Sequence, residues 1–330
     1  MVQEIVGSDE QESGQDEQLL QAAHLYYVDN LTQAEIARVL GVSRPTVSRL
    51  LTRARDEGIV QVTIRPWKVR DEALEQQFVQ LFGLKGAIIV RGVGVYSSAA
   101  ARKLIGYCAA PYVAELIHQN EIVGIGQGRT LAELAAAIRP SSALPPQALR
   151  IVQLLGDVAP HHSETLSHEL TRLLASRLDG QAYYLSAPAI VESKTLRDIL
   201  INSDTIRPVC AMYQRVQLAL VGIGAVEDSP LVLGGLVSPE QASQMHREGI
   251  VGDICGHFYD QDGMLRATVF SNRTVGIGWD ELRQCPTVVC VAGGPEKVLP
   301  ILGVLRGKVV NYLITDRLTA LEVIKRQTDG

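Results

Sequence analysis

The pattern of apolar and polar positions changes near residue 86, and this change divides the chain into two regions. Before it, apolar residues recur at three- and four-residue spacings, which predicts a series of amphipathic helices. After it, short apolar runs bounded by glycine alternate with amphipathic helical stretches. The expected strands are 86–90, 122–126, 151–155, 218–224, 287–293 and 312–315, and the expected helices include 99–117, 130–138, 168–178 and 296–305. Strands that are apolar on both faces, with helices between them, indicate a Rossmann-like α/β domain with a mostly parallel sheet covered on both sides.

Residues 31–50, in the first region, have the pattern of a helix, a tight turn and a second helix. Ala37 is small where the second helix has to cross the first closely. Gly41 is suited to the left-handed conformation that ends a helix, which a residue with a Cβ adopts only at a cost. Ser43 is a favourable N-cap for the second helix, and Pro45 is tolerated in its first turn. The spacing therefore predicts a helix-turn-helix motif, with an ordinary helical hairpin as the alternative.

The polar side chains of this motif predict a DNA-binding surface. In a helix-turn-helix, the N-terminal part of the second helix reads base edges, while flanking arginine and hydroxyl groups contact phosphates. The residues expected to contact double-stranded operator DNA are Gln33, Ser43, Arg44, Thr46, Ser48, Arg49 and Arg53. One recognition helix buries too little surface for tight, specific binding, so we expect at least a dimer.

Charge is distributed unevenly along the chain, whose net charge is only −5. Residues 31–70 contain eight Lys or Arg and three Asp or Glu, which gives this segment +5. Residues 1–30 contain no Lys or Arg and seven acidic residues, and residues 71–330 carry the remaining −3. A basic segment in an acidic chain is typical of a small DNA-binding domain.

The segments on either side of the motif complete the predicted domain organisation. An amphipathic helix is expected at 17–28, and the alternating residues 59–64 predict an edge strand like the wing of a winged helix. Residues 71–82 carry an apolar stripe, as in a connector that either pairs with a second subunit or packs on its own domain. The expected divisions are a disordered acidic tail at 1–16, a helix-turn-helix domain at 17–65, a linker helix at 66–85 and an effector domain at 86–330.

Composition and residue spacing limit the other classes of function. No apolar run approaches the length of a membrane-spanning helix, and the acidic start lacks the features of a signal peptide. The five cysteines stand at no metal-ligand spacing, as is typical of reduced thiols in a cytoplasmic protein. His161, His162 and His168 lack the helical spacing of a zinc site. We therefore expect a cytoplasmic protein with no metal, no cofactor and no membrane partner.

Glycine-rich turns and polar residues follow several of the predicted strands, where ligands of open parallel sheets bind. The loop 126–130 leads from a strand into a helix, so its backbone N–H groups and the helix N-terminus can bind an anion. Asp253 could accept hydrogen bonds from sugar hydroxyls, and Lys297 could contact a phosphate or a carbonyl. The candidate effector-binding residues are Gly126, Gln127, Gly128, Arg129, Thr130, Gly222, Gly224, Asp253 and Lys297. A strand-to-helix turn without a ligand is the alternative.

The chain resembles the SorC family of sugar-responsive bacterial transcription regulators. In the first region the resemblance is carried by Leu25-Tyr-Tyr27, Leu31-Thr-Gln-Ala-Glu-Ile-Ala37, Val42-Ser-Arg-Pro-Thr-Val-Ser-Arg-Leu-Leu51 and Ala54-Arg-Asp-Glu-Gly-Ile-Val60. In the second it is carried by Gly126-Gln-Gly-Arg-Thr-Leu131, Val251-Gly-Asp-Ile-Cys-Gly-His-Phe-Tyr-Asp-Gln-Asp-Gly263, Asn272-Arg-Thr-Val-Gly-Ile277, Val291-Ala-Gly-Gly-Pro-Glu-Lys297 and Leu313-Ile-Thr-Asp316. These pieces occur in order over residues 19–330, and their combination is more specific than any one of them.

The resemblance implies a DNA-binding domain followed by an effector domain similar to sugar-phosphate isomerases of the glucosamine-phosphate and ribose-phosphate type. It implies a homo-oligomer, commonly a tetramer, that responds to phosphorylated sugars or related metabolites. By the resemblance, the loop 126–130 would hold the phosphate, and Asp253 and Lys297 would hold the sugar. The chain departs from the family at Gln127, where many relatives have an aromatic or small residue.

Together these features predict a regulator of carbohydrate or polyol metabolism, and not an enzyme. Its operator binding would be controlled by a phosphorylated sugar, a polyol derivative or a related metabolite. One alternative is a sugar-phosphate isomerase or deaminase with a DNA-binding appendage, for which Asp253 and Lys297 could supply acid and base groups. Another is a DNA-associated scaffold with an empty pocket.

Overall fold

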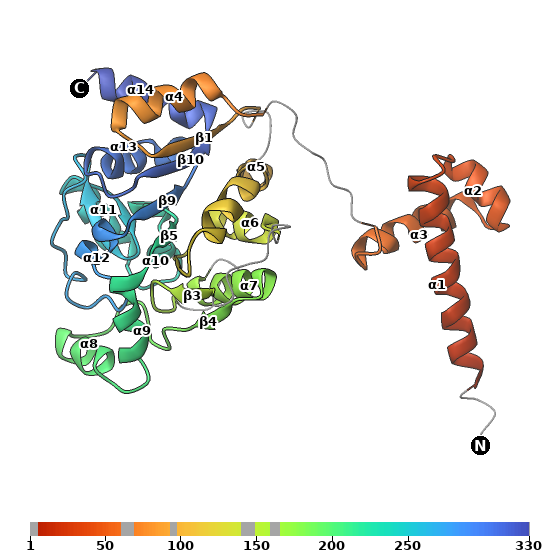
Figure 1. Ribbon diagram of the computed structural model, residues 1–330, viewed down its shortest axis with the longest axis horizontal. Coiled ribbons are helices and arrows are strands. Elements are labelled where there is room, and N and C mark those ends of the chain that lie inside the picture. Colours follow the sequence, from red (N-terminus) through yellow and green to blue (C-terminus); the bar gives the residue numbers. More distant parts are fainter. Residues whose placement is uncertain (1–5, 61–68, 93–97, 140–148, 159–165, 330) are drawn as a thin grey trace. The chain divides into compact units, whose positions relative to one another are not determined.

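A computed structural model describes residues 6–60, 69–92, 98–139, 149–158 and 166–329 (Figure 1). The chain forms two compact units, residues 1–66 and residues 67–330. The expected wing at 59–64 lies mostly outside the described residues, because 61–68 are not among them.

The first unit consists of three helices around a small apolar core. These are α1 (Val6–Tyr27), α2 (Gln33–Leu40) and α3 (Arg44–Asp56). Ala22, Ile36, Val47 and Leu51 are buried together between the helices. The predicted helix-turn-helix is therefore confirmed, with α3 as its second helix.

Local hydrogen bonds explain where α2 and α3 begin and end. Thr32 caps α2 in a reciprocal capping box with Glu35, and Gly41 ends that helix with φ at 65°. The Ser43 hydroxyl accepts a hydrogen bond from the Thr46 N–H at 3.3 Å, and Pro45 lies in the first turn of α3. The turn residues thus behave as their chemistry predicts.

The expected disordered tail at 1–16 is wrong for residues 6–16, which are the first part of α1. Leu19, Ala22 and Ala23 are buried and fix the later turns of this helix. Adding turns to a helix that is already nucleated costs little free energy.

The second unit is built on a seven-stranded parallel sheet in the part of the chain that the structure describes. Its strands, in spatial order, are β1 (Gly86–Val90), β10 (Tyr312–Asp316), β9 (Thr287–Val291), β5 (Leu218–Val221), β2 (Ile122–Ile125), β3 (Arg150–Gln153) and β4 (Gln181–Tyr183). Every neighbouring pair is parallel. The expectation of an α/β domain with a mostly parallel sheet is confirmed.

Helices cover both faces of this sheet. On one face α5 (Ser98–His118), α6 (Arg129–Ala137) and α7 (Ser167–Leu178) pack on residues such as Val123 and Val289. The other face is covered by α4 (Glu72–Phe82), α9 (Arg207–Met212), α12 (Trp279–Gln284), α13 (Val298–Arg306) and α14 (Arg317–Asp329). Peripheral helices are α8 (Lys194–Ile201), α10 (Pro230–Leu233) and α11 (Pro239–Arg247), with 3₁₀ turns η3 (Tyr213–Arg215), η4 (Val226–Asp228) and η5 (Pro295–Lys297).

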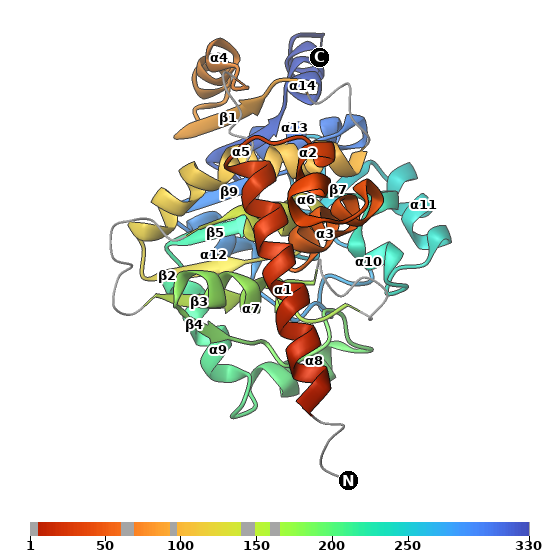
Figure 2. The same cartoon turned by 90° about the vertical axis from the view of Figure 1, so that its right-hand side faces the viewer.

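Helix α4, the expected linker helix, packs on its own domain. Leu74 and Phe78 are buried in the core that includes Ile89 of β1, and the Glu75 carboxylate accepts a hydrogen bond from the Ile89 N–H. Figures 1 and 2 show α4 beside α14, next to β1. Between these helices, the Asp71 carboxylate accepts a hydrogen bond from Arg317 at 2.9 Å. This helix therefore belongs to the second unit.

A small antiparallel sheet stands apart from the main one. It contains β6 (Gly224–Ala225), β7 (Ile250–Ile254) and β8 (His257–Asp260), in that order. The single strand expected at 218–224 is wrong in this respect, because β5 ends at Val221 and β6 pairs with β7 instead. The glycine at position 222 allows the chain to leave the main sheet between them.

Candidate functional site

Helix α3 presents the predicted DNA-contacting side chains on the face opposite its core. Val47, Leu51 and Ala54 are buried, whereas Ser43, Arg44, Ser48, Arg49 and Arg53 are exposed. Thr46, on α3, and Gln33, at the start of α2, are half-buried. A helix with one buried face and one basic, hydroxyl-rich face has the form of a recognition helix.

Four of these side chains interact with neighbours on α3 or at its caps. The Thr46 hydroxyl lies 2.8 Å from the Ser43 hydroxyl and 3.5 Å from an Arg49 guanidinium nitrogen. Arg53 donates a hydrogen bond to Glu57 at 2.5 Å. Arg44, at the first position of α3, has no ion pair among the described residues. Arg44, in the N-terminal half of the helix, is therefore more available to contact DNA than Arg53, which is paired with Glu57.

The candidate effector site lies where the order of strands in the main sheet reverses. Strands β2 and β5 are neighbours, but the chain runs from β2 to β3 on one side and from β5 to β9 on the other. At such a point the loops beyond the two strands diverge and leave a crevice. The loops that follow β2 and β5 contain the predicted Gly126–Gly128 and Gly222–Gly224 segments.

These loops approach each other so closely that glycine is required. The Gly126 N–H donates a hydrogen bond to the Leu220 carbonyl at 2.9 Å. A Cβ at Gly222 would overlap the carbonyl oxygen of Gln127. Gly128 is the N-cap of α6 with φ at 145°. Because Gly128 and Gly222 have no side chains, they leave the backbone at the N-terminus of α6 exposed toward the crevice.

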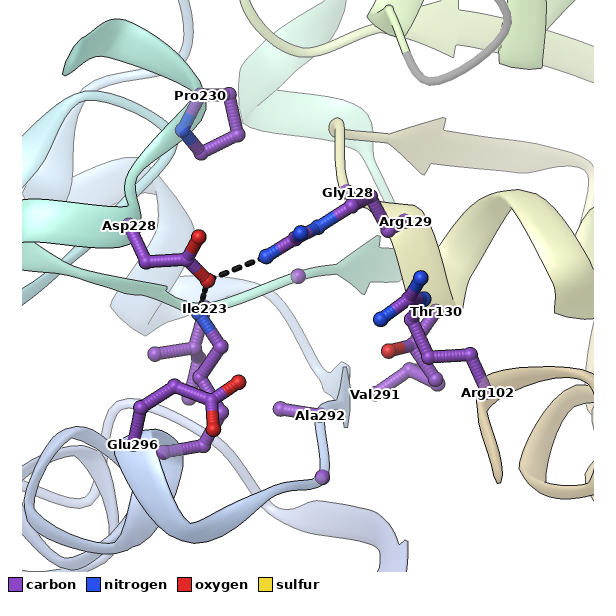
Figure 3. A pocket seen from close by; sticks show the side chains of 13 residues that line it. Arg102, Gly128, Arg129, Thr130, Ile223, Asp228, Pro230, Val291, Ala292 and Glu296 are labelled. Atoms are coloured by element: carbon purple, nitrogen blue, oxygen red, sulfur yellow. Dashed lines mark hydrogen bonds and ion pairs between the residues drawn. The ribbon is translucent and has the colours of Figure 1, made fainter. Parts of the chain in front are cut away.

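A small pocket that is open to solvent occupies this crevice (Figure 3). Its lining comes from the segments after β2, β5, β6 and β9 and from α5. The residues are Arg102, Gly128, Arg129, Thr130, Gly222, Ile223, Asp228, Pro230, Val291, Ala292, Gly293, Glu296 and Lys297.

Charged side chains dominate the pocket. Asp228 forms an ion pair with Arg129, and its Oδ2 also lies 3.4 Å from the Lys297 Nζ (Figure 3). Lys297 is buried, with a side chain that is 10% exposed. Arg102, from α5, is half-buried and has no ion pair among the described residues.

Asp253 lies behind the lining of this pocket. It is 3% exposed, and its Oδ1 has no hydrogen-bond partner among the described residues. Burial raises the pKa of its carboxyl, although hydrogen bonds from Ser229 and the Gly256 N–H and the charge of Lys297 act in the opposite direction. The Oε1 of the buried Gln127 also lacks a partner within the described part of the chain.

The structure thus divides the nine predicted effector residues into two groups. Five of them line the pocket: Gly128, Arg129, Thr130, Gly222 and Lys297. The other four, Gly126, Gln127, Gly224 and Asp253, do not line it. The sequence prediction missed Arg102, Asp228 and Glu296. Of these, only Glu296 lies in a glycine-rich segment at the end of a predicted strand, Gly293-Gly-Pro-Glu-Lys297.

Comparison with known proteins accounts for both units. A family model for a Crp-like helix-turn-helix domain matches residues 16–75, and a family model for a sugar-binding domain matches residues 69–325. The sorbitol operon regulator of Klebsiella pneumoniae is 32% identical over 93% of this chain and 97% of its own length. The deoxyribonucleoside regulator of Bacillus subtilis is 30% identical over 92% of this chain and 96% of its own length.

The full-length crystal structure of the sorbitol operon regulator SorC from Klebsiella pneumoniae covers 92% of this chain and 97% of its own, with a TM-score of 0.72 and 31% identity. The chain belongs to the SorC family. This SorC-family protein is a DNA-binding transcription regulator that carries a sugar-binding domain.

Two further observations concern the described residues of this SorC-family protein. None of their helices is long and apolar enough to cross a bilayer. No group of three His, Cys, Asp or Glu side chains among them is arranged to hold a metal ion. His168 stacks on Tyr184 at 4.4 Å between ring centroids, whereas His161 and His162 lie outside the described residues.

Proposed function

We propose that this protein binds operator DNA and that a phosphorylated sugar or polyol in its pocket controls that binding. The observation that carries the proposal is the pocket at the β2–β5 crevice, where Arg102, Arg129 and Lys297 surround exposed backbone at the N-terminus of α6. Backbone N–H groups at a helix N-terminus and nearby cations favour an anion such as phosphate. Relatives named as sorbitol operon and deoxyribonucleoside regulators support a sugar or polyol as the rest of the ligand.

Within this proposal, the phosphate binds at Gly128, Arg129 and Thr130, and the hydroxyl groups lie toward Lys297. Asp253 and Gln127 each bury an acceptor oxygen that has no partner among the described residues. Leaving such a group unpaired costs about 1–3 kcal/mol. Since neither residue lines the pocket, a ligand hydroxyl would reach these oxygens only after the lining moves. Gly224 acts by leaving space for Asp253, and Gly126 by leaving space for Cys255.

The DNA-binding residues in the proposal are Gln33, Ser43, Arg44, Thr46, Ser48, Arg49 and Arg53. Two copies of α3, from a homo-oligomer, contact two half-sites of the operator. Ligand binding changes the arrangement of the subunits, which requires different ligand affinities for the two arrangements. The protein acts in the cytoplasm, where the chromosome lies.

Ligand binding tests the proposal directly. The thermal midpoint of the full chain is measured with sorbitol 6-phosphate, ribose 5-phosphate, 2-deoxyribose 5-phosphate and the same compounds without phosphate. A compound that binds the folded protein raises the midpoint. We expect a rise with at least one phosphorylated compound, and no rise with its unphosphorylated form. A flat response to the whole panel would contradict the proposal.

Incubation with ribose 5-phosphate and with glucosamine 6-phosphate tests whether the protein is an enzyme. Glu296 lines the pocket and is exposed, so a carboxylate is present at the site. Isomerisation or deamination needs such a group placed at the reacting carbon, together with a second proton donor. We propose binding without turnover; conversion of ribose 5-phosphate or glucosamine 6-phosphate that is lost in Glu296→Gln would instead show an enzyme.

A further inference from the structure

Asp228 joins two of the cations that line the effector pocket. Arg129 begins α6 after β2, Lys297 ends η5 after β9, and Asp228 ends η4 after β6. One carboxylate oxygen of Asp228, Oδ2, is the partner of both the Arg129 guanidinium and the Lys297 ammonium. Three segments that are distant in the sequence therefore meet at a single acidic side chain (Figure 3).

The two sides of the pocket differ in how their charges are balanced. Figure 3 shows Arg102 and Thr130 on one side and the Arg129–Asp228 pair on the other. Arg102 has no ion pair among the described residues, whereas Arg129 and Lys297 share one acid. The positive charge of Arg129, which follows β2, is thus already paired with Asp228.

We propose that Asp228 is an internal counter-ion that competes with the ligand for Arg129 and Lys297. The phosphate of the effector displaces the carboxylate from these two cations, so that Asp228 determines which anions the pocket accepts. This inference rests on the proposed function, which supplies the class of effector, a phosphorylated sugar or polyol.

The charges explain why such a residue would select for phosphate. A phosphate monoester carries about −1.5 to −2 at neutral pH and offers three acceptor oxygens, whereas the Asp228 carboxylate carries one negative charge and offers two. A phosphate therefore competes for both cations. A neutral polyol cannot replace the ion pairs, and a singly charged anion gains little by exchanging with a carboxylate.

A different role for Asp228 predicts the opposite effect of its removal. If the carboxylate accepted hydrogen bonds from ligand hydroxyls, replacing it by an amide would weaken ligand binding. As a competing counter-ion it opposes every anion that approaches Arg129, so the same replacement strengthens anion binding. Inorganic phosphate is the best probe, because it has the charge of the effector and none of the sugar hydroxyls.

The experiment compares Asp228→Asn with Glu227→Gln in the full chain. Glu227 lies in the same 3₁₀ turn, is exposed and does not line the pocket, so its substitution removes the same charge without an ion pair to Arg129 or Lys297. The thermal midpoint is followed against inorganic phosphate, with ionic strength held constant by chloride so that screening does not change.

We expect the apparent dissociation constant for phosphate to fall about tenfold in Asp228→Asn and by less than about twofold in Glu227→Gln, because a charge at contact acts far more strongly than an exposed one. Phosphate binding by Asp228→Asn that is unchanged, weaker or absent would overturn the inference. So would an equal gain in Glu227→Gln. The proposed function would fail separately, if phosphorylated sugars and polyols did not bind the wild-type protein.

Discussion

The Oδ1 atom of Asp253 occupies the space that a side chain at position 224 would need. Gly224 and Asp253 are opposite each other across β6 and β7, and a Cβ on Gly224 would overlap this oxygen. The carboxyl is buried, and the raised pKa shows that its surroundings disfavour the charged form. In the small antiparallel sheet, the absence of a side chain at Gly224 therefore leaves space for the buried Asp253 carboxyl behind the pocket.

Substitution of this glycine tests that relationship. Gly224→Ala should lower the free energy of unfolding by about 1–3 kcal/mol, because the new methyl group displaces the Asp253 carboxyl. In an Asp253→Ala background the closest contact is removed and the Ser229 Cβ at 3.1 Å remains, so the same substitution should cost less. Urea unfolding of the four proteins measures both effects. Costs that simply add would show that the two residues do not interact.

The Asp71 carboxylate connects the start of α4 to two arginines. It accepts hydrogen bonds from Arg91 at 3.0 Å and Arg317 at 2.9 Å, and these arginines, with Arg91 the larger contribution, lower the pKa of Asp71 against the effect of burial. Asp71→Asn should lower the free energy of unfolding at neutral pH by about 1–2 kcal/mol, since both arginines are half exposed and solvent screens each pair.

The lowered pKa also predicts how this difference depends on pH. The stabilisation by Asp71 is present above the unfolded pKa of about 3.9 and is lost as the pH falls through the lower folded value. Wild type and Asp71→Asn should therefore converge in acid. Asp204→Asn is the control, because Asp204 pairs with Arg207 at 2.8 Å but its side chain is 95% exposed. A change above about 0.5 kcal/mol in this control would contradict the role of burial.

The predicted recognition helix is tested by its exposed arginines. Arg44→Ala and Arg49→Ala should each weaken operator binding by about 1–3 kcal/mol if they contact bases, and phosphate contacts would also reduce the salt dependence. Fluorescence anisotropy with a labelled operator measures both quantities. Arg172→Ala, which removes an exposed arginine of α7 paired with Glu169, should leave binding unchanged. Wild-type affinity in the Arg44→Ala/Arg49→Ala double variant would exclude α3 as the reading helix.

Arg102 offers a test of the pocket that the sequence did not suggest. Arg102→Ala should raise the dissociation constant for a phosphorylated ligand about tenfold, because a half-buried cation without an ion pair is lost. Arg326→Ala is the matched control: this exposed arginine lines a neighbouring cavity and pairs with Glu322 at 3.1 Å. Calorimetric titration of both variants checks the difference. Equal losses would place the anion in the neighbouring cavity, which Arg102 also lines.

Much of the fold could be predicted from local patterns. Six strands of the main sheet are short apolar runs, and each was expected. The exception, β4, spans only Gln181–Tyr183 and is not fully buried, so it leaves no apolar run. The division between β5 and β6 was also missed, because both lie in one continuous apolar segment and only pairing with β7 separates them.

The candidate site was only partly predictable, for a physical reason. The glycine-rich loop that leads into α6 has a local signature, because close backbone approach requires glycine. Arg102 and Asp228 have none: each is an ordinary charged residue in its own segment. The strand order brings both to the β2–β5 crevice, and strand order depends on packing across the whole sheet.

Coupling between the two units is the central claim, and operator binding in the presence of ligand measures it most directly. The dissociation constant for the operator is determined with sorbitol 6-phosphate, ribose 5-phosphate and 2-deoxyribose 5-phosphate, and with sorbitol, ribose and 2-deoxyribose as unphosphorylated controls. We expect at least one phosphorylated compound to change it about tenfold or more, a coupling of about 1.4 kcal/mol, while its unphosphorylated form leaves it unchanged. An operator affinity that stays the same with a phosphorylated compound shown to bind the protein would contradict the account.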